Sequence, residues 1–272
     1  MLTLPHRNGL AASRLYLPAG VGPTLLDAVA ALFPSISRAD WQSRFERALV
    51  LDAEGQPLAA SAPSREGMLL RYYREVPAEP LIPFTETVLH QDAHLLVADK
   101  PHFLPVTPSG PYLQETVLVR LKQKLGIDTL VPIHRIDRDT AGLVMFSVQP
   151  QNRAAYNALF SQRAVKKTYE AVAPWRDDLA LPLTRESRME EAGHFMLQHE
   201  VSGPPNAVTH IDVLEVLGPL ARYALSPVTG KRHQLRVMAA AAAKARLEAS
   251  RKGGKKGVKK PIGKQAVKRA AQ

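Results

Sequence analysis

The sequence predicts an α+β protein with three parts: a small N-terminal α/β module, a larger domain with a mixed, mostly antiparallel central sheet flanked by helices, and a basic disordered tail. Of the 272 residues, 45% are hydrophobic and 22% are charged, which is typical of a globular chain. Apolar residues recur at helical spacing in some stretches and form short strand-like runs in others. The composition then changes abruptly over residues 239–272, which are rich in Ala, Lys and Gly.

Residues 1–80 are expected to form the N-terminal module. Apolar residues recur at helical spacing over 25–32 and 36–49, and Ser35 and Ser37 are candidate N-caps for the second helix. Strands are expected near 48–51 and 67–74, before a proline-rich extended connector. The order of helix, helix and hairpin weakly resembles a small RNA-binding module of ribosomal proteins.

Residues 81–238 show the alternation of strands and helices that indicates an α+β domain. Short apolar or alternating runs bounded by Gly, Pro or Asn predict strands, and longer amphipathic stretches predict helices. The expected strands are 94–99, 141–148, 167–173, 194–200, 206–217 and 220–226, and the expected helices are 114–125 and 151–162. The later strands follow one another without helices between them, which favours antiparallel pairing.

The positive charge of the chain is concentrated at its end. The formal net charge is +11, but residues 239–272 contain eleven Lys or Arg and one acidic residue, Glu248. The rest of the chain is therefore nearly neutral. A helix over 239–249 is compatible with the alanine run, whereas the residues from about Ser250 onward offer too little apolar surface to offset the entropy of folding.

Several classes of protein are excluded by composition. The chain has no cysteine, which removes disulfides, thiolate metal sites and cysteine nucleophiles, and agrees with a reducing cytoplasm. No apolar run approaches the roughly 20 residues of a membrane helix. We therefore expect a cytoplasmic protein with no membrane partner.

The densest polar cluster of the sequence is the segment 133–143, which precedes an apolar strand. It places Asp137 between Arg135 and Arg138, and guanidinium groups favour an ionised carboxylate and can bind phosphate. A solvated charged loop is the competing interpretation. A kinase-like motif is excluded, because Ile136 separates the Arg from the Asp and no glycine-rich phosphate loop lies upstream.

The segment that begins at His134 resembles the signature of the RluA family of pseudouridine synthases, His-Arg-(Leu/Ile)-Asp-x-x-(Thr/Ser)-(Ser/Ala)-Gly-Leu. Three further segments match the family in order and spacing. They are the Lys-Pro element at 99–106, the strand motif Lys-Thr-Tyr-Glu-Ala at 167–171, and the late motif Thr-Gly-Lys-Arg-His-Gln-Leu-Arg-Val at 229–237. Together the matches cover roughly residues 85–238.

This resemblance implies an enzyme that isomerises uridine in ribosomal or transfer RNA to pseudouridine, without a metal or other cofactor. Asp137 would be the catalytic aspartate, and Arg236 would pair with it. Tyr169 would stack on the uracil and assist removal of the proton from carbon 5. An ordinary strand aromatic is the alternative interpretation of Tyr169.

The resemblance also implies a set of RNA contacts, because the enzyme must extrude the target nucleotide from its helix. Arg135 would fill the space left by the base. Expected roles for the others are shaping of the loop by His134 and Thr140, support of the loop by Lys100 and Pro101, packing under the uracil by Leu235, and backbone contacts by Lys231, Arg232, His233 and Gln234. A solvated basic turn is an equal alternative for the first two of these backbone contacts.

The match to the family ends after Val237. The family continues with a histidine, a short helix and a Gly-x-Pro-Ile-x-Gly-Asp turn, whereas this chain has Met238 and an alanine run. We therefore expect an atypical end of the domain, and three explanations stay open: it is shortened, replaced by tail contacts, or altered by a change of reading frame.

Two other functions remain open at this stage. The first is a non-catalytic RNA-binding or ribosome-assembly protein whose basic tail provides the affinity. The second is a hydrolase using Asp137 and His134, which lacks a Ser or Cys nucleophile in context. In each case we expect a monomer.

Overall fold

The computed structural model describes residues 4–76, 78–177, 179–191 and 198–238. The expected basic tail, and the helix considered over 239–249, lie outside the described residues. The chain divides into two compact units, Met1–Phe160 and Ser161–Gln272.

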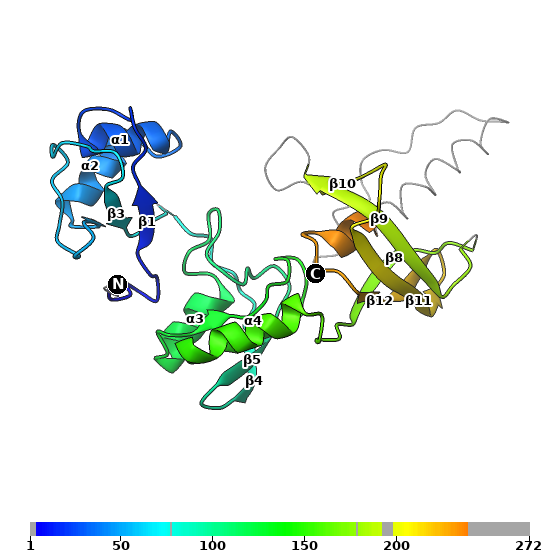
Figure 1. Ribbon diagram of the computed structural model, residues 1–272. Coiled ribbons are helices and arrows are strands. Elements are labelled where there is room, and N and C mark those ends of the chain that lie inside the picture. Colours follow the sequence, from blue (N-terminus) through cyan, green and yellow to red (C-terminus); the bar gives the residue numbers. More distant parts are fainter. Residues whose placement is uncertain (1–3, 77, 178, 192–197, 239–272) are drawn as a thin grey trace. The chain divides into compact units, whose positions relative to one another are not determined.

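The first unit begins with two helices and a small antiparallel sheet, drawn in blue and cyan in Figure 1. Its elements are β1 (Ser13–Tyr16), α1 (Leu25–Leu32), α2 (Arg38–Glu46), β2 (Val50–Leu51) and β3 (Leu69–Tyr72), with the strand order β1-β3-β2. Thr24 and Asp27 form a capping box at α1, and Ser37 caps α2 as predicted. The fully buried Trp41 packs in the core of this sheet and its helices.

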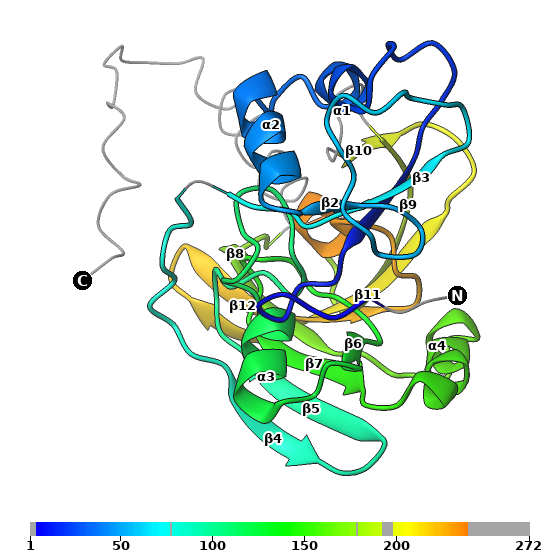
Figure 2. The same ribbon diagram turned by 90° about the vertical axis from the view of Figure 1, so that its left-hand side faces the viewer.

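The remainder of the first unit is a four-stranded antiparallel sheet with helices. Its elements are β4 (Thr87–Gln91), β5 (Leu95–Lys100), α3 (Val117–Leu125), β6 (Val131–Pro132), β7 (Gly142–Ser147), a short 3-10 turn (Pro150–Asn152) and α4 (Arg153–Ser161), with the strand order β4-β5-β7-β6. Helix α3 packs on the sheet, as Figure 2 shows, through Val117 and Leu121 against Leu96 and Phe146. This sheet carries the segment 133–141 between β6 and β7.

The second unit is a five-stranded antiparallel sheet followed by a helical turn over 234–238. Its strands are β8 (Tyr169–Pro174), β9 (Leu183–Glu191), β10 (Gln198–Val201), β11 (Ala207–Leu217) and β12 (Leu220–Pro227), in the order β10-β9-β11-β12-β8. The buried Ala221, Tyr223 and Leu225 of β12 form the centre of its core.

The predicted α+β class with antiparallel strands is confirmed, and every strand pairing among the described residues is antiparallel. The strands expected after residue 81 form two sheets, one in each unit, instead of a single central sheet. Strands β1, β4, β6 and β9 were not expected from the sequence. No helix in the described part of the chain is long and apolar enough to cross a membrane.

Candidate active site

Asp137 lies in the segment between β6 and β7, on a turn in which the Thr140 N–H donates to the Asp137 carbonyl at 3.1 Å. The Asp137 side chain is half-buried, whereas Arg135 and Arg138 are exposed on either side of it. We call residues 134–140 the aspartate loop. It presents two carboxylates, Asp137 and Asp139, and two guanidinium groups between β6 and β7, and Asp139 is paired with Arg138 at 3.1 Å. The exposed guanidinium groups suit the loop to a polyanionic substrate.

Lys100, at the end of β5, holds the aspartate loop through hydrogen bonds of its ammonium group. Its side chain is fully buried (0% exposed), and its ammonium group donates to the carbonyls of Pro101 at 2.9 Å, Leu104 at 2.8 Å and Arg138 at 3.0 Å. Three N–H groups therefore meet three acceptors. Burial lowers the pKa of Lys100 from 10.5 to about 8, although the nearby carboxylates of Asp139 and Asp137 oppose that shift.

His134 holds the other end of the aspartate loop. Its Nε2 accepts a hydrogen bond from the Met145 N–H at 3.2 Å, and its ring stacks on Phe160 with the centroids 5.0 Å apart. The accepting Nε2 implies that the proton of the neutral ring is on Nδ1. This geometry is compatible with the loop-shaping role expected of His134, which stays a prediction.

The sequence did not predict that His102 and Tyr112 contact the aspartate loop, or that an exposed Phe103 lies beside His102. His102 Nδ1 donates to the Asp139 carbonyl at 2.7 Å, and Phe103 follows it with 52% exposure. The guanidinium of Arg138 lies 6.0 Å from the ring centroid of Tyr112. For His102 and Phe103 the available signal was their position directly after the Lys-Pro element. No local signal marks Tyr112.

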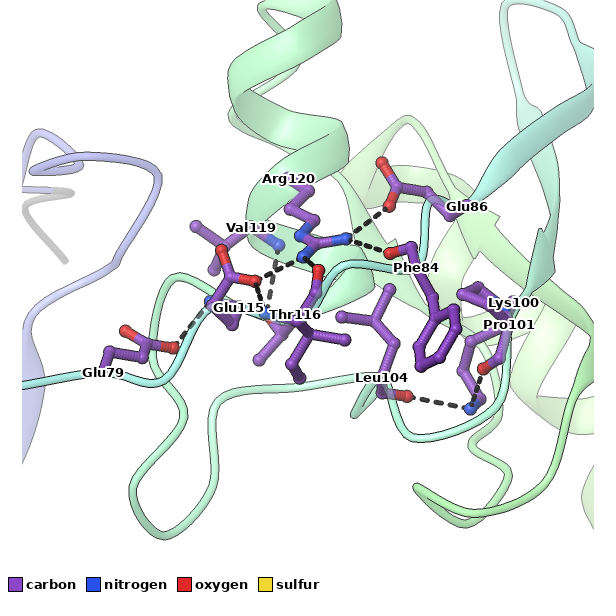
Figure 3. A network of polar contacts seen from close by, with 11 residues as sticks. Glu79, Phe84, Glu86, Lys100, Pro101, Leu104, Glu115, Thr116, Val119 and Arg120 are labelled. Atoms are coloured by element: carbon purple, nitrogen blue, oxygen red, sulfur yellow. Dashed lines mark hydrogen bonds and ion pairs between the residues drawn. The ribbon is translucent and has the colours of Figure 1, made fainter. Parts of the chain in front are cut away.

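The connector that precedes β4 is fixed to the start of α3 by a network of buried and partly buried charges, shown in Figure 3. Glu79 accepts three backbone N–H bonds, from Leu113, Gln114 and Glu115, at 2.7, 2.9 and 2.6 Å. Arg120 donates to the carbonyls of Ile82 and Phe84, both at 2.7 Å, and to the carboxylates of Glu86 and Glu115. The connector is therefore held along its length, and Phe84 lies on a fixed backbone.

In the second unit, Tyr169 opens β8, and both Tyr169 and Leu235 pack against the core of the five-stranded sheet. Arg236 is exposed on the helical turn 234–238. The turn itself is anchored by Gln234, whose side chain is 4% exposed. Its amide nitrogen donates to Val208 O at 3.1 Å and Thr209 Oγ1 at 2.8 Å, and its oxygen accepts from Thr229 Oγ1 at 2.8 Å and Lys231 N at 3.0 Å.

The basic residues of this turn differ in their surroundings. Lys231 and Arg232 are exposed, and Arg232 lies 3.8 Å from the carboxylate of Glu191. His233 is half-buried and adopts φ 55°. Lys231 and Arg232 are thus accessible to a polyanion, and Gln234 is turned into the protein.

The predicted site residues fall in both units. The first unit contains Asp137, His134, Arg135, Thr140, Lys100 and Pro101, and the second contains Tyr169, Arg236, Lys231, Arg232, His233, Gln234 and Leu235. The structure brings together the members within each unit, and the pairing of Asp137 with Arg236 stays a prediction. Within the described ranges, no group of three or more His, Asp or Glu side chains could hold a metal ion.

Comparison with known proteins gives a consistent family. Residues 94–241 match the model of the RNA pseudouridylate synthase family. An RNA pseudouridine synthase of Synechocystis is 31% identical over 148 residues, which cover 54% of this chain and 50% of the relative, so that the chain spans half the length of that protein. The dual-specificity RNA pseudouridine synthase RluA of Haemophilus influenzae is 32% identical over 168 residues, covering 58% of this chain and 72% of the relative.

A third relative is the mitochondrial tRNA pseudouridine(32) synthase of Saccharomyces cerevisiae, which is 28% identical over 154 residues, covering 55% of this chain and 33% of the relative. The matched family region includes the whole aspartate loop and the late motif that ends at Val237. The resemblance identified from the four sequence motifs is thereby confirmed: the chain belongs to the RNA pseudouridylate synthase family, with RluA proteins among its relatives.

Proposed function

We propose that this protein isomerises specific uridines of ribosomal or transfer RNA to pseudouridine, with Asp137 as the catalytic aspartate. The observation that carries the proposal is the aspartate loop, in which a half-buried carboxylate between two exposed arginines is fastened by Lys100 and His134. The names of the relatives from Haemophilus and yeast support an RNA substrate, and the yeast name favours transfer RNA.

The reaction requires one ionised carboxylate, acting as nucleophile or base. The glycosidic bond from carbon 1 of the ribose to nitrogen 1 of uracil breaks, the base turns, and a bond forms from the same ribose carbon to carbon 5 of uracil. Carbon 5 then loses its proton and nitrogen 1 gains one, so the product is an isomer of the substrate. We propose that Asp137 attacks or deprotonates, that Arg236 pairs with it, and that Tyr169 assists the final proton loss.

Release of tritium from RNA labelled at carbon 5 of uridine tests this proposal, since that hydrogen is lost only when the new bond has formed. Unmodified transcripts of ribosomal and transfer RNA serve as substrates. Asp137→Asn should abolish release and leave RNA binding largely intact. Asp139→Asn is the matched control, because Asp139 lies in the same loop, pairs with Arg138 at 3.1 Å and is given no chemical role. Equal turnover by Asp137→Asn and the wild type would refute the assignment.

A non-catalytic RNA-binding or assembly protein is the second candidate function, favoured by the concentration of positive charge in residues 239–272. Deletion of these residues separates the two functions. A tail-driven binder would lose most of its affinity and its salt dependence. The enzyme would keep site-specific modification of the same uridines, because the proposed chemical groups all precede residue 239.

A further inference from the structure

Two phenylalanine rings lie together on the surface of the first unit. Phe84 is 47% and Phe103 is 52% exposed, and their centroids are 5.9 Å apart with the ring planes tilted by 42°. The ring centroid of His102 lies 5.9 Å from that of Phe103. Aromatic side chains contribute most when buried, so neighbouring exposed rings point to a function on the surface.

The backbone of Phe103 strengthens this argument. Its φ is 67°, in the left-handed region that bulky side chains rarely adopt and that glycine occupies readily. A glycine would therefore suit the turn better than phenylalanine does, as far as the local fold is concerned. A strained residue with an exposed ring indicates that the ring itself is used.

Both rings stand on fixed backbone. The Lys100 ammonium binds the carbonyls of Pro101 and Leu104, which closes the turn beneath His102 and Phe103. The Phe84 carbonyl accepts from Arg120 at 2.7 Å, while its ring points toward the segment of Pro101 and Leu104 (Figure 3). Little conformational entropy remains to be lost when a ligand stacks on rings that are held in this way.

The same turn is joined directly to the aspartate loop. Lys100 donates its third hydrogen bond to the Arg138 carbonyl, and His102 donates to the Asp139 carbonyl. The exposed guanidinium groups of Arg135 and Arg138 belong to that loop. A nucleotide next to the reacting uridine would thus find aromatic faces for its base and guanidinium groups for its phosphate in one connected surface.

We propose that Phe103 and Phe84 form a stacking platform for an unpaired base of the RNA substrate that neighbours the target uridine. The inference rests on the proposed function for the identity of the RNA. Stacking on an aromatic face tolerates any base, so the platform would contribute affinity and position more than it would select a sequence.

The first test measures binding of fluorescein-labelled dodecauridine, a single-stranded probe. Phe103→Gly should weaken binding by about tenfold, as expected for the loss of one stacked base. Its melting temperature should equal or exceed that of the wild type, because glycine relieves the strain at φ 67°. The slope of log Kd against log salt should stay unchanged, since no phosphate contact is removed. Phe84→Leu should weaken binding in the same way, because leucine keeps the apolar surface and lacks the aromatic face.

A tryptophan replacement and a matched control complete the experiment. Phe103→Trp should keep the affinity, and the emission of the new tryptophan should be quenched by dodecauridine. Leu89→Ala removes an equally exposed apolar side chain, 57% accessible on β4, and should bind like the wild type. Unchanged binding by Phe103→Gly would overturn the proposal. So would a loss shared by Leu89→Ala, or a loss explained by a lower melting temperature.

The outcome is separable from that of the proposed function. Tritium release by the wild type decides whether the protein is a synthase, and dodecauridine binding does not depend on that result. Once a transcript that the wild type modifies has been identified, its unmodified form serves as the substrate. Phe103→Gly should then raise KM about tenfold and change kcat little. A change in kcat alone would place Phe103 in the support of the aspartate loop and overturn its role as a platform.

Discussion

The aspartate loop and the turn that carries Arg236 are each fastened by one buried polar side chain, and the two anchors differ in charge. Lys100 uses an ammonium group with three donors for three carbonyls. Gln234 uses a neutral amide that donates to two groups and accepts from two others. An ammonium suits a set of acceptors only, and an amide suits a mixed set. The carboxylate side of the proposed site therefore has a titratable support, whereas the arginine side has a support that does not titrate.

The largest effect is expected from Lys100→Met, which breaks the charged anchor. Methionine fills a similar volume but removes the donor from the buried carbonyl of Leu104 and from the partly buried carbonyls of Pro101 and Arg138. An unmet buried group costs about 1–3 kcal/mol. The aspartate loop should shift, and a displacement of about 1 Å near reacting atoms can lower kcat on the order of 100-fold. Single-turnover tritium release measures this loss. The Kd for RNA should change little.

Lys122→Met provides the matched control, because Lys122 on α3 is also buried, at 7% exposure, and lies outside the proposed site. Only Lys100→Met should lose kcat at a temperature where both variants are folded. An equal fall in kcat in the two variants would show that the loss of any buried lysine lowers activity. The hydrogen bonds of Lys100 to the aspartate loop would then have no special role.

A smaller effect is expected from Gln234→Leu, which breaks the neutral anchor. Val208 O and Thr229 Oγ1 keep other hydrogen bonds when the amide is lost, so the free energy of unfolding should fall by only about 1–3 kcal/mol. We expect kcat/KM to fall about tenfold, because the proposed partnership of Arg236 with Asp137 would be weakened while Lys100 still holds the aspartate loop. Thermal unfolding and tritium release measure the two effects. Gln42→Leu is the control, because it removes only an exposed hydrogen bond to Glu46 on α2, and it should alter the free energy of unfolding by less than about 0.5 kcal/mol. An equal loss of stability in Gln42→Leu and Gln234→Leu would contradict the anchoring role of Gln234.

The supporting role of Lys100 could be predicted from the sequence, whereas that of Gln234 could not. Lys100 was expected to support the catalytic loop, since it belongs to a motif and ends a strand, and the register of β5 with β7 places it opposite Gly142 beside that loop. Gln234 was expected to contact RNA. Its burial depends on Val208 and Thr209, which are 26 and 25 residues away on β11, and no local pattern encodes such a contact.

The secondary structure shows the same difference between features encoded by local sequence and features that depend on distant residues. Helix α1 was predicted with its observed bounds, because its apolar spacing and cap are local. Strand β9, with the sequence LTRESRMEE, is mostly polar and forms because it pairs with β11 on one side and β10 on the other. The pairing of Phe84 with Phe103 likewise joins residues that no spacing rule connects.

The smallest expected effect, and the one that separates the two anchors most directly, is the dependence of activity on pH. The pKa of Lys100 is lowered by burial to about 8, so a neutral amine with two N–H groups for three carbonyls replaces the ammonium as the pH rises through that value. The aspartate loop then loses one fastening bond, and kcat should fall to about half of its plateau near pH 8. The effect on stability has the opposite sign. Because the folded pKa of Lys100 lies below the unfolded value of 10.5, the protonated lysine opposes folding below pH 8, and that opposition is relieved between about pH 8 and 10.5.

A pH profile of tritium release should show the fall in kcat above about pH 8 as an alkaline limb in the wild type. The limb should persist in Gln234→Leu, which keeps Lys100, and should be absent in Lys100→Met. An alkaline limb that persists in Lys100→Met would assign the titration to another group and remove the functional distinction between the two anchors.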